Sequence, residues 1–201
     1  PPELLDGWPA RLGLVSLNRY PDPSASVLRQ KLKDGLGLGG GDGLELMLGN
    51  GSDELIQLIL QAVAGPGRQV LAPGPTFVMY RMISISLGLE YREVPLTTEF
   101  NLDVTGMLQA LAEFEPAVLF IAYPNNPTGN LFDADDLATI IEAAPGLVVV
   151  DEAYQPFADR SVVEWLQRYD NLLLMRTLSK SGLAGLRLGY LVGPSAWIKE
   201  F

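Results

Sequence analysis

The sequence predicts an α/β protein with three layers, α/β/α, in which a mainly parallel central sheet lies between helices. Two observations lead to this prediction. Short apolar runs of four or five residues recur along the chain, and helical patterns of ten residues or so lie between several of them. The runs at 118–121 and 147–150 are apolar at every position, as expected for strands covered on both faces.

The N-terminal residues 1–23 are rich in proline and glycine and are interpreted as an extended arm, and residues 24–201 as one large domain. A helix is expected at 24–33, where Val27, Leu28 and Leu32 share one face, and a loop at 35–43, which is mostly glycine. Strands are then expected at 44–48, 69–72, 118–122, 147–150, 172–175 and 188–192, and helices at 53–64, about 76–87, 104–113, 134–144 and 161–168.

The composition excludes several classes of function. The net charge of −10 would repel nucleic acid and anionic membranes, so we expect neither as a partner. A phosphate-bearing ligand must therefore be captured by local amides and a few cations. Cysteine and histidine are both absent, which removes disulfides, the Ser-His-Asp triad, cysteine-based metal sites and most zinc sites, and no metal is expected. No apolar run is long enough to span a membrane, and no signal peptide is recognised, so a cytoplasmic protein is expected.

Four polar motifs share one position relative to the predicted strands. The segments 49–52, 124–129, 151–154 and 177–180 each follow an apolar run directly. In a parallel sheet these are the carboxyl ends of the strands, where such folds bind their ligands. The motifs are therefore expected to meet at one edge of the sheet.

Lys180 lies in a hydroxyl-rich turn after the apolar run 172–175. A lysine at the mouth of a buried strand is expected to be dehydrated, which favours the neutral amine over the ammonium. A neutral amine is what a lysine needs to condense with a carbonyl group.

Asp151 closes the apolar run 147–150 and is expected to be buried. An isolated aspartate in this place is more often a helix N-cap or half of an ion pair. The sharper interpretation is a partner for a protonated pyridine nitrogen, which would make a cofactor ring an electron sink. Tyr154 follows three residues later and could donate a hydrogen bond to a phenolate oxygen in the same pocket.

The other motifs are ambiguous when taken singly. Residues 124–129 have the composition of a simple turn, but two prolines and a glycine could also fix the Asn126 amide for a ligand oxygen. Ser52 could be a plain N-cap, or the amides of 52–54 at a helix N-terminus could bind phosphate. Arg187 could close over the same phosphate or pair with a carboxylate. Phe77 could belong to the core or stack on a planar ring.

The glycines at 35–40 spell G-x-G-x-x-G, but no strand precedes them and no helix follows. This context argues against dinucleotide binding and against a nicotinamide oxidoreductase.

Taken together, four motifs resemble those of the fold-type-I pyridoxal-phosphate aminotransferases of class II, and most closely the histidinol-phosphate branch. They are Gly-Asn-Gly-Ser-Asp-Glu at 49–54, Pro-Asn-Asn-Pro-Thr-Gly at 124–129, Asp-Glu-Ala-Tyr at 151–154 and Arg-Thr-Leu-Ser-Lys at 176–180. The resemblance extends from Asn18 to Tyr190. It implies pyridoxal 5'-phosphate as the cofactor, bound by the large domain at 24–201.

The resemblance also implies a role for each matching residue. Lys180 would form the Schiff base and move the proton, Asp151 would hold the ring nitrogen, and Tyr154 and Asn126 would bond the phenolic oxygen. The full set of cofactor-binding residues that it implies is Ser52, Asp53, Glu54, Phe77, Asn126, Asp151, Tyr154, Thr177, Ser179, Lys180 and Arg187, together with Tyr20 from a partner subunit. A homodimer with shared active sites is therefore implied.

The implied reaction is transamination between L-histidinol phosphate or imidazole-acetol phosphate and glutamate or 2-oxoglutarate, in histidine biosynthesis. An aromatic aminotransferase, a threonine-phosphate decarboxylase and a catalytically silent domain of the same fold are the alternatives. The sequence departs from the family in two ways. The spacing from Lys180 to Arg187 is seven residues where many relatives have eight, and the smaller C-terminal domain with its carboxylate-binding arginine is expected beyond Phe201.

Overall fold

The structure is a computed structural model and describes residues 6–41 and 43–201. The described residues fall into two compact units, divided between Leu38 and Gly39. The first unit contains the helices α1 (Trp8–Leu12) and α2 (Ser26–Gly35). The expectation of an extended arm was wrong for α1, where Pro9 lies in the first turn and favours a helix start. The helix expected at 24–33 is confirmed as α2, and residues 1–5 of the expected arm lie outside the described residues.

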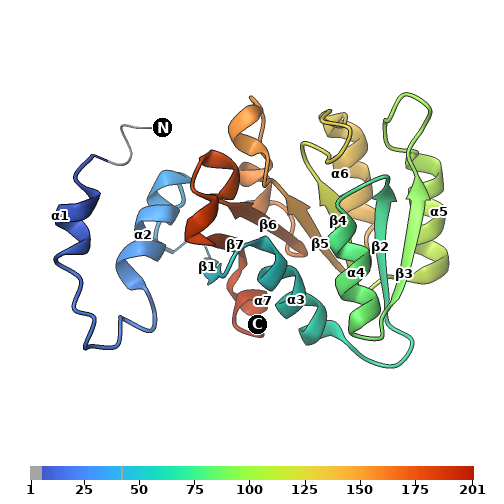
Figure 1. Cartoon of the computed structure of the whole chain (residues 1–201). Coiled ribbons are helices and arrows are strands. Elements are labelled where there is room, and N and C mark those ends of the chain that lie inside the picture. Colours follow the sequence, from blue (N-terminus) through green and yellow to red (C-terminus); the bar gives the residue numbers. More distant parts are fainter. Residues whose placement is uncertain (1–5, 42) are drawn as a thin grey trace. The chain divides into compact units, whose positions relative to one another are not determined.

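The second unit is an alternation of strands and helices (Figure 1). Its elements are β1 (Leu44–Gly49), α3 (Ser52–Val63), β2 (Gln69–Gly74), α4 (Val78–Ser86), β3 (Glu90–Pro95), α5 (Val104–Phe114), β4 (Val118–Ala122), α6 (Ala134–Ala143), β5 (Leu147–Asp151), η2 (Gln155–Phe157), η3 (Val163–Gln167), β6 (Leu172–Thr177), η4 (Ser179–Ser181), η5 (Ala184–Leu186), β7 (Gly189–Pro194) and α7 (Ser195–Ile198).

In the described residues the strands form one seven-stranded sheet in the order β1-β7-β6-β5-β4-β2-β3. β7 pairs antiparallel with both β1 and β6, and the other pairs are parallel. The prediction of a mainly parallel sheet is confirmed. Six strands therefore end at the same edge of the sheet, and the reversed strand β7 begins there.

Helices cover both faces of this sheet. α3 and α4 pack on one face, where Ile56, Ile59 and Tyr80 join Val149 and Met175 in a buried cluster. α5 and α6 contact each other and bury Met107, Leu137 and Ile141; right-handed crossovers place them on the opposite face. Figure 1 shows α3 and α4 in front of the strands and α5 and α6 behind them. The predicted three layers are confirmed.

Several elements of the second unit differ from the expectations. The helix expected at 161–168 is the short 3₁₀ helix η3, and α7 was not expected. Strand β3 was missed because it pairs with β2 alone and is exposed at four of its six positions, so Glu90, Arg92 and Glu93 interrupt any apolar run. In the described part of the chain, no helix is both long and apolar enough to cross a membrane.

Candidate active site

A cavity opens at the edge where the six strands end. Residues at the ends of five of these strands and in the connections after them line it, and they are Ser52, Asp53, Phe77, Ala122, Pro124, Asn126, Asp151, Ala153, Tyr154, Thr177, Ser179, Lys180 and Arg187. Ten of the twelve residues expected to bind the cofactor are in this set. The structure thus brings together motifs that lie up to 135 residues apart in the chain, from Ser52 to Arg187.

Asp151 forms the most buried polar part of the cavity wall, with 4% of the residue exposed. Its Oδ2 accepts a hydrogen bond from the Tyr80 hydroxyl at 2.7 Å, and its Oδ1 accepts one from the Ala153 amide at 3.0 Å. A carboxylate has about four lone-pair sites. These two bonds therefore leave Asp151 able to accept a further donor from the cavity.

Burial raises the pKa of Asp151 from 3.8 to about 6, and the negative charges of Glu152 and Asp53 act in the same direction. The hydrogen bonds from Tyr80 and the Ala153 amide oppose this rise because they stabilise the ionised form. A cation placed in the cavity would also favour the ionised form. Asp151 is therefore suited to hold a positively charged nitrogen.

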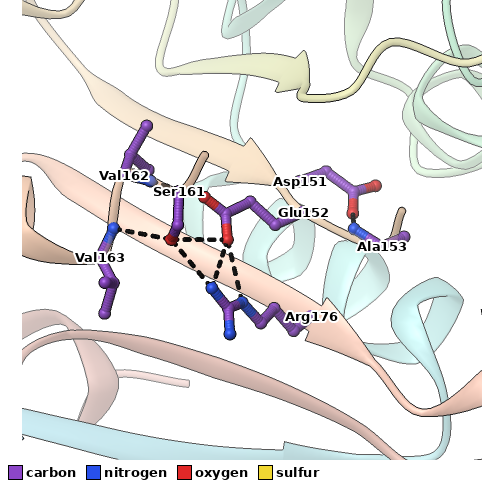
Figure 2. A network of polar contacts seen from close by, with 7 residues as sticks. All are labelled: Asp151, Glu152, Ala153, Ser161, Val162, Val163 and Arg176. Carbon is purple, nitrogen blue, oxygen red and sulfur yellow. Dashed lines mark hydrogen bonds and ion pairs between the residues drawn. The ribbon is translucent and has the colours of Figure 1, made fainter. Parts of the chain in front are cut away.

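Glu152 is also buried, but its carboxylate points away from that of Asp151, as Figure 2 shows. Its Oε2 accepts bonds from Arg176 Nε at 2.9 Å and Nη2 at 2.7 Å, and its Oε1 accepts from the Val162 amide at 2.7 Å. Ser161 donates to the same carboxylate at 3.0 Å. This network ties the loop after β5 to strand β6, so it holds the cavity wall between Asp151 and Tyr154 in place.

The turn after β4 is held by the residue next to the expected one. Asn125 is buried, and its amide nitrogen donates to the Pro75 carbonyl at 3.0 Å and to Thr128 Oγ1 at 2.7 Å. Its Oδ1 accepts from Thr76 Oγ1 at 3.2 Å. Asn125 thereby joins the turns after β2 and β4, and Asn126 beside it faces the cavity.

Lys180 lies in the turn η4, and its Nζ is 5.0 Å from the centre of the Tyr154 ring. The expectation of a dehydrated lysine was wrong for this structure, because Lys180 is exposed. The buried part of β6 ends at Thr177, and the turn carries Lys180 three residues further, to the cavity rim. The contact with the Tyr154 ring favours a position over the cavity mouth.

The N-terminus of α3 forms a second polar region of the cavity. Gly51 precedes the helix with φ 86°, and a Cβ there would come within 2.6 Å of Arg187 Nη2. A Cβ at Gly189 would come within 2.7 Å of the Gly51 carbonyl carbon and 3.1 Å of the Ser52 nitrogen. Two glycines thus allow the guanidinium, the helix amides and the start of β7 to approach closely.

This second region has the chemistry of an anion site. Free amides at a helix N-terminus bind phosphate, and the half-exposed Arg187 adds a bidentate cation. Its Nη2 is 4.0 Å from Asp53 Oδ2, too long for a strong ion pair. Thr177 and Ser179 bring two hydroxyls to the same cavity.

Two of the expected residues are placed elsewhere. Glu54 does not line the cavity, and its carboxylate accepts a hydrogen bond from the Asn50 amide at 2.5 Å, as in a capping arrangement. Tyr20 belongs to the first unit, where it is fully exposed. The roles that the resemblance implies for these two residues remain predictions.

Sequence reasoning missed three residues that organise the site: Tyr80, Asn125 and Arg176. Tyr80 lies three residues after Phe77, but its place in an apolar helix does not say that its hydroxyl reaches Asp151. Asn125 and Arg176 lie inside recognised motifs, but nothing in the sequence says which asparagine faces inward or that Arg176 pairs with Glu152.

The profile of the family "Aminotransferase class I and II" matches residues 14–201. The chain belongs to this aminotransferase family. Its match covers almost the whole sequence, including every cavity-lining residue.

Two curated relatives of this aminotransferase chain share one name. It is 61% identical to "Histidinol-phosphate aminotransferase 2" of Nitrosococcus oceani over 99% of the chain and 55% of that protein. It is 53% identical to the protein of the same name from Cupriavidus pinatubonensis, over 100% of the chain and 56% of that protein. The chain thus spans about half the length of these curated relatives.

A solved structure shares the fold. The histidinol-phosphate aminotransferase of Sinorhizobium meliloti, solved in complex with pyridoxal-5'-phosphate, superimposes with a TM-score of 0.86 at 27% identity. The match covers 99% of this chain and 54% of that one.

The close approach of Gly189 to Gly51 generates a first prediction. Gly189→Ala should displace the backbone at the start of α3, because the added Cβ would overlap main-chain atoms that cannot rotate away. Overpacking of this kind costs about 1–3 kcal/mol, and a displacement of the α3 amides by that cost should lower the affinity of this anion site for inorganic phosphate about tenfold or more. Gly185→Ala is the matched control, because a Cβ there meets nothing within 4 Å. Equal affinities of the two variants, measured by fluorescence titration, would contradict the anion site.

The environment of Asp151 generates a second prediction, for the cofactor-free protein. The pKa of Asp151 is about 6 in the folded protein, above the ordinary value of 3.8 for an aspartate carboxyl group, so Asp151 favours folding at low pH. This contribution is complete below about pH 4 and is lost as the pH rises through 6. Asp151→Asn removes the dependence and should raise the free energy of unfolding above pH 6 by about 3 kcal/mol relative to the unmodified protein. Urea unfolding from pH 4 to 7.5 measures this difference, and a constant difference would refute it.

Proposed function

We propose that this chain binds pyridoxal 5'-phosphate and forms the cofactor-binding part of a histidinol-phosphate aminotransferase. The observation that carries the proposal is the meeting of Lys180, Asp151 and the anion site around α3 at one cavity. The identities of 61% and 53% to histidinol-phosphate aminotransferases support the choice of substrate.

The residues fit the cofactor at three places. The cradle of Gly51, Gly189 and the α3 amides suits its phosphate, because a Cβ at either glycine would fill that space. Asp151 retains the capacity to accept a bond from the ring nitrogen. Lys180 supplies a primary amine at the cavity rim for the carbonyl carbon.

When bound, the cofactor supplies an electron-accepting ring and a carbonyl that carries the amino group from one substrate to the next. The protein's own groups then have separate tasks. Asp151 would hold the ring nitrogen in its protonated form, and Phe77 would lie against the ring face. Asn126 and Tyr154 would donate to the phenolic oxygen. Lys180 moves a proton to and from the substrate α-carbon, acting as a general acid and base.

We propose that the amino group passes between L-histidinol phosphate or imidazole-acetol phosphate and glutamate or 2-oxoglutarate, as part of histidine biosynthesis. A cytoplasmic location is proposed with this biosynthetic role. Screening amino donors against purified protein tests the substrate: transfer from L-histidinol phosphate should exceed transfer from aromatic amino acids. The reverse order would favour an aromatic aminotransferase.

A homodimer is part of the proposal. Val78, Met82 and Ile85 lie at helical spacing on α4 and are 59%, 52% and 53% exposed. An apolar stripe of this kind suits contact with a second copy of the chain. Tyr20 of that second copy is proposed to reach the active site, as the resemblance implies.

Lys180→Ala should abolish transamination, with a loss of at least about a thousandfold, because it removes both the amine and the proton carrier. The variant should keep the circular dichroism spectrum and unfolding midpoint of the unmodified protein, since Lys180 is exposed. Lys199→Ala removes another exposed lysine and should retain full activity. Turnover by the Lys180 variant would refute the assigned role.

Met82→Asp should weaken dimerisation by about tenfold or more, since it places a charge within the apolar stripe. Sedimentation equilibrium measures the dissociation constant, and Gln57→Asp, on the exposed face of α3, is the control. If the unmodified protein is monomeric, or if both variants dimerise equally, this surface is not the interface.

A further inference from the structure

Tyr80 is a tyrosine that the proposed mechanism does not use. It is completely buried, its ring stacks on Phe120 at 4.7 Å between ring centres, and it meets the edge of Phe77 at 5.5 Å. A phenylalanine would make the same ring contacts. The hydroxyl is what distinguishes Tyr80, and its hydrogen-bond partner is the Asp151 carboxylate.

The Asp151 carboxylate is held from two directions. Tyr80 approaches Oδ2 from helix α4, and the Ala153 amide approaches Oδ1 from its own loop. If the Ala153 amide were the only donor, the plane of the Asp151 carboxyl group could rotate about the hydrogen bond to Oδ1. The second hydrogen bond, from the Tyr80 hydroxyl, prevents this rotation. The lone pairs of the Asp151 carboxylate that remain free then point in one direction relative to the cavity.

Phe77 lines the cavity and touches the Tyr80 ring, so the start of α4 and the residue that precedes it carry both contacts. Phe77 would lie against the face of a flat ring, and the Asp151 carboxylate would meet the edge of that ring. The contacts of Tyr80 with both thus fix the two positions together. A displacement of α4 would move both.

We propose that Tyr80 is a positioning residue, whose hydroxyl fixes the Asp151 carboxylate and thereby sets how tightly the protein holds the ring nitrogen of the cofactor. This inference rests on the function proposed above. It differs from a role in core packing, because only the hydroxyl is required.

The charged groups that face the Asp151 carboxylate are known. Asp53 on α3 and Glu152 next in the chain raise its pKa, and Lys180 and Arg187 line the same cavity. None of them changes in a Tyr80→Phe variant. Removing the hydroxyl takes away the largest influence that lowers the pKa of Asp151, so that pKa should rise above about 6.

Tyr169 provides a matched control within the same chain. It is buried like Tyr80, but its hydroxyl has no hydrogen-bond partner among the described residues. Tyr169→Phe therefore removes a buried hydroxyl without removing a bond to Asp151.

The experiment compares two probes: pyridoxal phosphate and its analogue with carbon in place of the ring nitrogen. Tyr80→Phe should weaken binding of pyridoxal phosphate about tenfold, as expected for a bond to a charged group, and should leave binding of the analogue unchanged. Tyr169→Phe should change neither. In the cofactor-free protein, ¹³C NMR titration should show a raised pKa for Asp151 in the Tyr80 variant alone.

Each outcome decides between the explanations. Equal weakening of both probes would mean that Tyr80 acts through packing, and no change with either probe would mean that its hydroxyl is not used; both overturn the inference. If the unmodified protein does not bind pyridoxal phosphate, the proposed function fails as well, whereas equal binding of the two probes by the unmodified protein would overturn the inference alone. The two failures are thus distinguishable.

Discussion

The carboxylate of Asp151 is buried at the end of β5, where the free energy of a negative charge depends on the few polar groups that reach it. Tyr80 and the Ala153 amide are two such groups, and both hold it in a fixed orientation. The raised pKa of about 6 shows that they do not fully offset the cost of burial. A cation in the cavity would offset the rest of the cost of burying the Asp151 carboxylate. The stability of this region is therefore coupled to ligand binding.

The other polar groups of the cavity are in a different environment. Lys180 is exposed and Arg187 is half-exposed, so their interactions are screened by water. Their contribution depends on position more than on burial. The sheet supplies that position, because six strands end at one edge and β7 begins there. Glu152 and Arg176 then bind the loop after β5 to β6.

Most of the sheet could be predicted because the apolar runs of its central strands are recognised in the sequence without knowing which strands pair with them. The prediction failed at β3, whose polar edge residues follow no such pattern. The cavity residues were predictable because each follows a strand directly. Tyr80 was not singled out, since a tyrosine in an apolar helix has the same pattern whether or not its hydroxyl has a partner. The exposure of Lys180 also escaped prediction, because the length of the turn after β6 decides it.

The proposed function requires Lys180 to lie where a carbonyl-bearing cofactor binds. Reducing the protein with borohydride after incubation with pyridoxal phosphate, followed by peptide mass spectrometry, identifies the lysine that bound the cofactor. We expect stable pyridoxyl label confined to Lys180, with neither Lys199 nor the lysines of α2 modified at stoichiometric cofactor. Label spread over the lysines, or none at all, would contradict it.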